Sequence, residues 1–165
     1  MRATASEAFL ASASASFNLN IFAERLRRTL PGLWCGVLLA IALVATPAAS
    51  GALDRASFGA VARAIFAREA PTSLVFGVLV LMLERRAALA RHEAGGVSQF
   101  SSEMMLAIGA LFCTVAGYYG LQPMMEQARS GAATTLTFMQ LHAISLAFFG
   151  VKGLLALALA WRATR

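Results

Sequence analysis

The sequence predicts an all-α fold: a polytopic membrane protein built as a four-transmembrane-helix bundle, with an amphipathic interfacial helix before the second span. Of the 165 residues, 59% are hydrophobic and only 13% are charged, whereas a soluble domain carries about a quarter charged residues. Long uncharged runs recur along the chain, and most basic residues flank them. Since a lipid-exposed backbone must satisfy its hydrogen bonds within its own segment, these runs are predicted to be helices.

The N-terminal part is predicted to be a tail followed by the first span. Residues 1–20 contain the run ASASAS and are expected to be flexible, and residues 21–165 are expected to form a single transmembrane domain. The uncharged stretch 29–53 contains the first span, at about 30–50. Its end resembles a signal-peptidase site, but the basic region before it is long for a signal peptide, so we expect the span to be retained.

The second span is the least regular. Residues 54–69 place Phe58, Val61 and Ile65 on one helical face, which predicts an amphipathic helix in the membrane interface. The alternative is that this segment extends the next span. The apolar run 70–83 has 14 residues, so it covers only about 21 Å of a ~30 Å hydrocarbon core. It must therefore draw on its flanks, and the span is predicted at about 67–86.

The remaining two spans are clearer. The uncharged run 104–125 is long enough to cross, and a polar loop precedes it. The last span is predicted at 140–161, where Lys152 is the only charge.

Arginine positions predict the orientation of these spans. With four crossings, nine arginines fall on one side and four on the other, so the positive-inside rule places both termini in the cytoplasm. Trp34 and Trp161 would then lie at the inner interface, with Tyr118 and Tyr119 toward the outer one.

Composition also limits the partners. A net charge of +6 fits anionic membrane lipids, and no groove-reading motif indicates nucleic acid. Cys35 and Cys113 both fall in apolar runs and are expected to pack as small hydrophobes. Small residues are expected at helix contacts, within the chain, in a homo-oligomer or with a membrane-protein partner. They include Gly32, Gly36, Gly117, Gly120, Gly150 and Gly153.

Lys152 is the strongest functional signal, because a charge near the middle of a span is costly. No acidic residue lies deep in a predicted span, so the sequence offers Lys152 no obvious counter-ion. It either snorkels to the interface or lines a polar cavity. Helical periodicity places His142 and Ser145 on its face, opposite Tyr118 and Gln122 of span three. The candidate polar pocket between spans three and four therefore comprises Tyr118, Gln122, His142, Ser145 and Lys152.

Metal binding and catalysis have weaker support. Soft sulfur and imidazole ligands suit Cu(I), and Met124, Met125, Met139 and His142 cluster near the outer end. Because this set does not define a site, we expect no metal and no cofactor. The sequence has no nucleophile elbow, HExxH motif, phosphate loop or paired carboxylates, so an enzyme is not expected.

The order of four stretches resembles the bacterial domain-of-unknown-function 4149 family, which is related to eukaryotic transmembrane protein 205. The stretches are LWCGVLLAIALVATP (33–47), FGAVARAIF (58–66), YYGLQP (118–123) and LHAISLAFFGVKGLLALALAW (141–161). The resemblance implies a compact four-helix protein of the bacterial inner (plasma) membrane without an established activity or catalytic residues. The association of the eukaryotic relative with platinum-drug resistance keeps a soft-metal role in view.

Three functional hypotheses follow. The first is a non-enzymatic protein that binds or transports a small solute or ion through the polar pocket. The second is a structural or accessory subunit of a membrane complex. The third is a copper or soft-metal resistance protein.

Overall fold

The computed structural model describes residues 2–95, 100–132 and 134–164; before Phe17, the only side chain described is that of Glu7. The described chain is helical. Its elements are α1 (Arg2–Ala40), η1 (Ile41–Ala45), α2 (Thr46–Ala52), α3 (Arg55–Glu93), α4 (Ser102–Thr114), η2 (Val115–Gly120), α5 (Gln122–Arg129) and α6 (Phe138–Ala163). Four continuous rods result, and all four are long and apolar enough to cross a membrane. The predicted all-α, four-helix architecture is confirmed.

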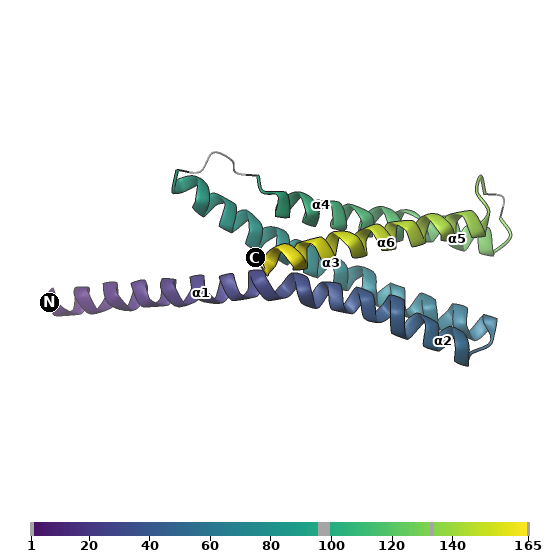
Figure 1. Cartoon of the computed structure of the whole chain (residues 1–165), viewed down its shortest axis with the longest axis horizontal. Coiled ribbons are helices and arrows are strands. Elements are labelled where there is room, and N and C mark those ends of the chain that lie inside the picture. Colours follow the sequence, from purple (N-terminus) through teal and green to yellow (C-terminus); the bar gives the residue numbers. More distant parts are fainter. Residues whose placement is uncertain (1, 96–99, 133, 165) are drawn as a thin grey trace.

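The four rods run alternately up and down and form a closed bundle (Figure 1). Helix α1 packs against α3 and α6, and α4 packs against the same two helices. Helix α1 begins at Arg2, so the segment 2–20, which we expect to be a flexible tail, belongs to a helix. Its mobility stays a prediction.

The interfacial helix predicted before the second span is not a separate element. Residues 55–69 are the first part of α3, which continues unbroken to Glu93. The alternative reading of this segment, an extension of the next span, is therefore the correct one. One contact holds this segment inside the bundle: the Phe66 ring, next to the predicted apolar face, meets Phe149 of α6 edge-on, with centroids 5.4 Å apart.

Polar caps define where two of the rods begin. Asp54 precedes α3, and its Oδ1 accepts hydrogen bonds from the backbone N–H groups of Ala56 (2.9 Å) and Ser57 (3.1 Å). Hydrogen bonds from Ser57 and Ala56 also hold the pKa of the exposed Asp54 carboxyl below its usual value. Thr137 and Gln140 form a capping box at the start of α6. These caps set the chain turns at the end of the bundle where the pocket lies.

The core lies toward the opposite end and is centred on Trp34. This indole is fully buried, stacks on Phe76 with centroids 6.4 Å apart, and is surrounded by Leu38, Val80 and Leu159. That Trp34 lies at the depth of the membrane interface stays a prediction, but the ring faces the inside of the bundle and not lipid. Its N–H has a hydrogen-bond partner inside the bundle, Ser73 Oγ at 2.9 Å, so the ring does not need the interface to satisfy its polar atom.

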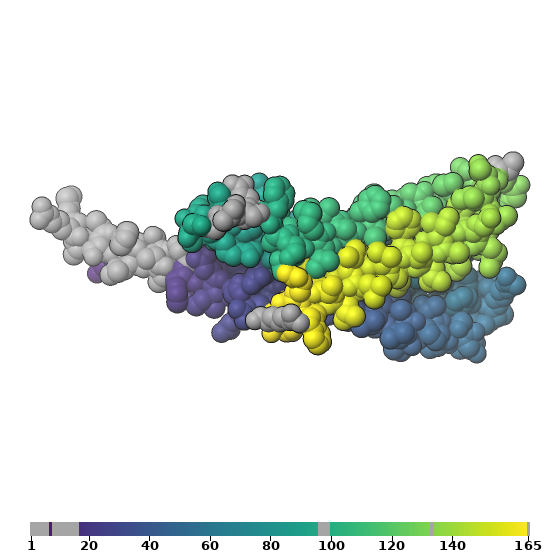
Figure 2. All heavy atoms as spheres, turned by 45° about the horizontal axis from the view of Figure 1, so that its top comes forward, coloured from purple at the N-terminus to yellow at the C-terminus, as the bar shows by residue number. Residues whose placement is uncertain are grey.

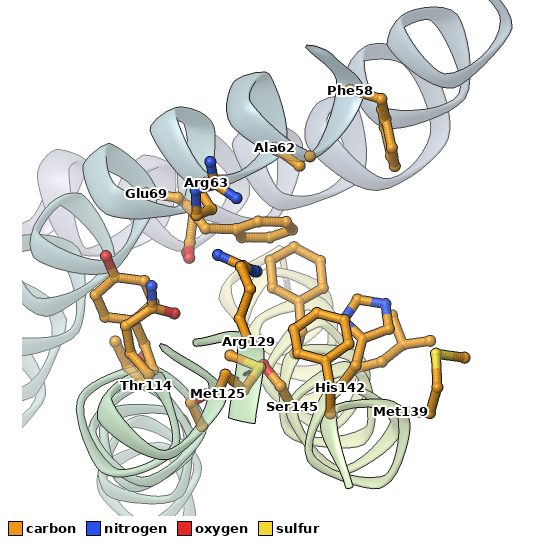
Figure 3. Close-up of a pocket in the computed structure, with 18 of the residues that line it drawn as sticks. Phe58, Ala62, Arg63, Glu69, Thr114, Met125, Arg129, Met139, His142 and Ser145 are labelled. Atoms are coloured by element: carbon orange, nitrogen blue, oxygen red, sulfur yellow. Dashed lines mark hydrogen bonds between the residues drawn. The ribbon is translucent and has the colours of Figure 1, made fainter. Parts of the chain in front are cut away.

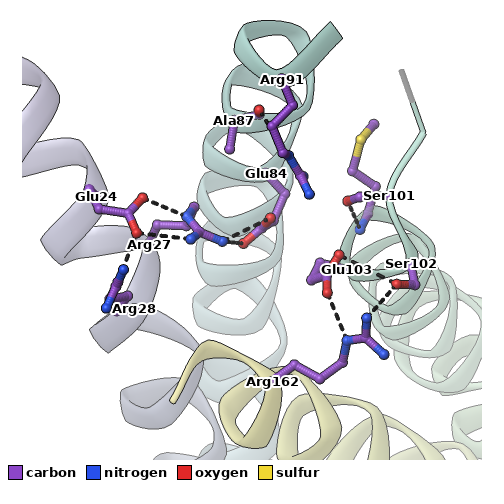
Figure 4. Close-up of polar contacts among 11 residues, drawn as sticks. Glu24, Arg27, Arg28, Glu84, Ala87, Arg91, Ser101, Ser102, Glu103 and Arg162 are labelled. Carbon is purple, nitrogen blue, oxygen red and sulfur yellow. Dashed lines mark hydrogen bonds and ion pairs between the residues drawn. The ribbon is translucent and has the colours of Figure 1, made fainter. Parts of the chain in front are cut away.

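Ion pairs join the rods at the end nearest the C-terminus (Figure 4). Arg27 of α1 reaches the buried Glu84 of α3, with Nη1 and Oε1 3.1 Å apart. Arg162 of α6 reaches Glu103 of α4, with Nε and Oε1 2.7 Å apart. Each bridge connects two neighbouring helices of the ring, so this end of the bundle is held together on two sides.

The close helix contacts fall at different glycines from most of those predicted. A Cβ added at Gly32, Gly36, Gly150 or Gly153 would meet nothing within 4 Å. By contrast, a Cβ at Gly117 would lie 2.5 Å from Cβ of Phe148, where α6 crosses η2. Gly117 is therefore the one glycine of the predicted set that a helix crossing requires in the described chain.

We expect Gly117→Ala to lower the free energy of unfolding by about 1–3 kcal/mol, because the methyl group overpacks the contact with Phe148. Gly150→Ala on α6 is the matched control, since its Cβ enters open space and Ala favours a helix. Unfolding in detergent, followed by circular dichroism, measures both. Equal stability of the two variants would contradict the assigned crossing.

Candidate binding pocket

A cavity of about 660 Å³ opens at the end of the bundle away from the ion pairs (Figure 3). At this end α2 packs against α3, while η2 and α5 pack against α6. The two pairs of helices face each other, and the cavity lies between the first half of α3 and the group η2, α5 and α6. Figure 2 shows the blue surface of α2 and early α3 beside the green and yellow surface of α5 and α6 at this end.

The structure places the five predicted pocket residues around this one cavity. Its lining includes Tyr118, Gln122, His142, Ser145 and Lys152. The predicted position, between spans three and four, is incomplete, because α3 supplies a third wall through Phe58, Ala62 and Phe66 among others. That these side chains bind a ligand stays a prediction.

A π-helical turn shapes the α4–α5 wall. Element η2 interrupts the rod at Val115–Gly120 and brings Gly117 and Tyr118 into the lining. The hydroxyl of Ser145 donates to the carbonyl oxygen of Gly117 at 3.2 Å, which ties this turn to α6. Single π turns are frequent at functional sites, because they aim side chains away from the regular helical register.

Lys152 has a counter-ion, contrary to the expectation from the sequence. Its Nζ lies 2.6 Å from Oε1 of Glu69 on α3, and both side chains are almost fully buried. Nζ also lies 4.9 Å from the centroid of the Phe149 ring. Glu69 directly precedes the apolar run 70–83, and the continuous helix carries it to the depth of Lys152. Lys152 does not snorkel to the interface, because the charge is neutralised where it is.

The ion pair is the end of a longer polar chain. Ser73 Oγ donates to Glu69, one turn away on α3, and Trp34 Nε1 donates to Ser73 Oγ. The chain therefore joins α1, α3 and α6 through consecutive hydrogen bonds. Among the described residues no buried side-chain nitrogen or oxygen lacks a partner, as buried polar groups require.

Three arginines occupy the outer part of the cavity: Arg55 and Arg63 on α3, and Arg129 at the end of α5. Arg129 pairs with Glu126 of its own helix at 3.1 Å and lies over the Phe138 ring, 5.1 Å from its centroid. Phe138 in turn stacks on His142, with ring centroids 6.0 Å apart and an angle of 7° between the ring planes. These arginines are not among the pocket residues predicted from the sequence.

The candidate soft-metal ligands do not all come together. Met125, Met139 and His142 line the cavity, whereas Met124 does not. Within residues 2–95, 100–132 and 134–164, no group of three or more His, Cys, Asp or Glu side chains is placed to hold a metal ion.

The buried pair gives a test of the polar chain. Glu69→Gln or Lys152→Met alone leaves one buried charge uncompensated, so each is expected to cost about 3–5 kcal/mol of unfolding free energy. The double variant removes both charges and is expected to cost less than the sum of the single changes.

The control is Arg28→Gln, which removes an exposed pair with Glu24 and should cost no more than about 1 kcal/mol. Detergent unfolding of all four proteins provides the measurement. Strictly additive losses would show that the two side chains do not interact.

The comparisons with known proteins place the chain in a family. A family model described as a domain of unknown function (DUF4149) matches residues 29–134. No curated protein matches the chain. No solved structure matches it either. The matched region covers the C-terminal part of α1 and all elements from η1 to α5, and it ends before α6. The chain, a helical protein with four rods suited to a membrane, belongs to the DUF4149 family.

Proposed function

We propose that this protein is a non-enzymatic inner-membrane protein that binds a small solute in the cavity between α3 and α6. The observation that carries the proposal is the pair Lys152–Glu69, which is buried at the inner end of the cavity. Ionisable groups inside a membrane are costly and typically mark ligand or ion pathways. Polar side chains from several helices converge on the same cavity, as in ligand pockets generally.

The cavity has one closed end, which favours binding in a pocket. Beyond Lys152 along α6, Ala156 and Leu159 belong to the apolar core that contains Trp34 and Leu38. This core fills the bundle between the pocket and the ion-paired end. A transport role would need a second arrangement of the helices in which this core separates.

The charge distribution supports an orientation for the pocket. We place both termini in the cytoplasm, because nine arginines then lie inside and four outside. Arg55, Arg63 and Arg129 are among the four outer arginines, so the pocket opens toward the outer leaflet.

Reporter fusions test this orientation. A fusion within the loop 94–101, between α3 and α4, is expected to report a cytoplasmic location, and one within 130–137 an external location. Phosphatase and fluorescent-protein fusions expressed in a bacterial host measure the two sites. The reverse pattern would place the pocket at the inner leaflet.

An accessory role is the second candidate, and a specific observation supports it. Gly32 and Gly36 of α1 and Gly150 and Gly153 of α6 have open space where a Cβ would be. Small residues of this kind allow a second helix to approach closely in a membrane. A partner subunit or a second copy of the chain would use these positions, and the native mass in mild detergent separates this role from solute binding by a monomer.

Cys113 provides a direct test of solute access. It lines the cavity, whereas Cys35 belongs to the apolar core. We therefore expect a small anionic methanethiosulfonate reagent to modify Cys113 much faster than Cys35, because only Cys113 can be reached through the pocket, whose excess charge is positive. Peptide mass spectrometry of the reconstituted wild-type protein measures both rates.

Cys35 serves as the internal control in this experiment, since it is buried to a similar extent. Reaction of both thiols at the same rate would indicate general unfolding. An unreactive Cys113 in the folded protein would remove the proposed pocket.

A further inference from the structure

We propose that the pocket binds a single-chain anionic amphiphile. Its carboxylate or phosphate head is held by Arg55, Arg63 and Arg129, and its acyl chain lies among the aromatic rings. This inference rests on the proposed function and names the class of its ligand. It is carried by the presence of arginines without an ion pair and of apolar side chains in the lining of one cavity.

The charges of the lining favour an anion. The cavity is lined by four cationic side chains and one carboxylate, Glu69. Because Glu69 is paired with Lys152, the three arginines account for the excess positive charge. Arg129 has a carboxylate partner on its own helix, Glu126, whereas Arg55 and Arg63 have no ion pair with any described residue.

The arginines approach from opposite walls. Arg129 reaches from the α5 side into the space between the helices (Figure 3), and Arg63 lines the cavity from α3. Guanidinium groups bind carboxylate and phosphate oxygens through paired hydrogen bonds. Basic pockets between transmembrane helices bind anionic headgroups in the same way.

The apolar part of the lining suits a hydrocarbon chain. Phe66 and Phe149 form an edge-to-face pair between the arginines and Lys152. On α6, Met139 and Leu146 line the cavity and are 65% and 62% exposed. The rim on this side is therefore apolar and faces lipid in a membrane, which gives an acyl chain an entrance from the bilayer.

The size of the cavity favours one chain. A volume of about 660 Å³ lies within the range of pockets that bury most of a drug-sized molecule. An inorganic anion would leave the aromatic part of the cavity unused, and an uncharged lipid would leave the arginines without a partner.

Dodecyl phosphate is the probe, added to the protein in dodecyl maltoside and counted by native mass spectrometry. We expect one molecule to bind the wild type, and Arg63→Gln and Arg129→Gln each to raise its dissociation constant about tenfold, the effect of losing one charged hydrogen-bonding partner. Arg68→Gln is the matched control: Arg68 is an exposed arginine of α3 outside the pocket lining, and its loss should leave binding unchanged.

Three further probes separate the ligand classes. Dodecanol has the chain but no anionic head, inorganic phosphate has the head group but no chain, and diacyl phosphatidylglycerol has an anionic head with two chains. All three should bind more weakly than dodecyl phosphate. Equal binding of any of them, or equal effects of Arg63→Gln and Arg68→Gln, would overturn the inference.

The ligand class and the pocket fail separately. If Cys113 reacts through the pocket but dodecyl phosphate does not bind, the ligand class is wrong and the pocket stands. If Cys113 is unreactive and dodecyl phosphate does not bind, both are wrong. Thermal unfolding of the arginine variants in the same detergent checks that lost binding does not reflect lost folding.

Discussion

The contact between Lys152 and Glu69 is the constraint on which the rest of the structure depends. Two unit charges cannot stay inside an apolar bundle unless they meet, and their meeting sets the depth of α6 against α3. Ser73 and Trp34 extend this constraint to α1. Three of the four rods are thus held in register by one polar chain, and the fourth, α4, packs against two of them.

The polar chain divides the bundle into two halves of different character. On one side, small and aliphatic residues pack around Trp34, and the bridges Arg27–Glu84 and Arg162–Glu103 join neighbouring helices. On the other side no ion pair joins two helices among the described residues, and the helices pack in two separate pairs with the cavity between them. The cavity is therefore positioned by a firm half of the molecule, as a binding site requires.

Much of the fold follows from the sequence, and the reason is the chemistry of lipid. Apolar runs near 20 residues long must be helices, so α1, α4 and α6 are predictable from length alone. The side chains grouped around the cavity on α6 follow from helical periodicity, as with His142, Ser145 and Lys152. What periodicity cannot supply is the partner from a distant helix. Glu69 lies at the edge of the apolar run 70–83, which is too short to cross a membrane. The shortness of this run indicates that the helix must extend beyond it and include Glu69. The place of Trp34 in the core, by contrast, depends on a hydrogen bond to Ser73 on another helix. A local sequence pattern cannot predict such a contact.

The indole of Trp34 gives the molecule an optical property of its own. The chain has two tryptophans: Trp34 is fully enclosed, and Trp161 is 64% exposed near the C-terminal end of α6. A collisional quencher dissolved in the surrounding phase reaches the second ring and not the first. The fluorescence that remains after quenching therefore comes from Trp34, the ring hydrogen-bonded to Ser73. Its emission maximum reports the polarity of the bundle core without any added dye.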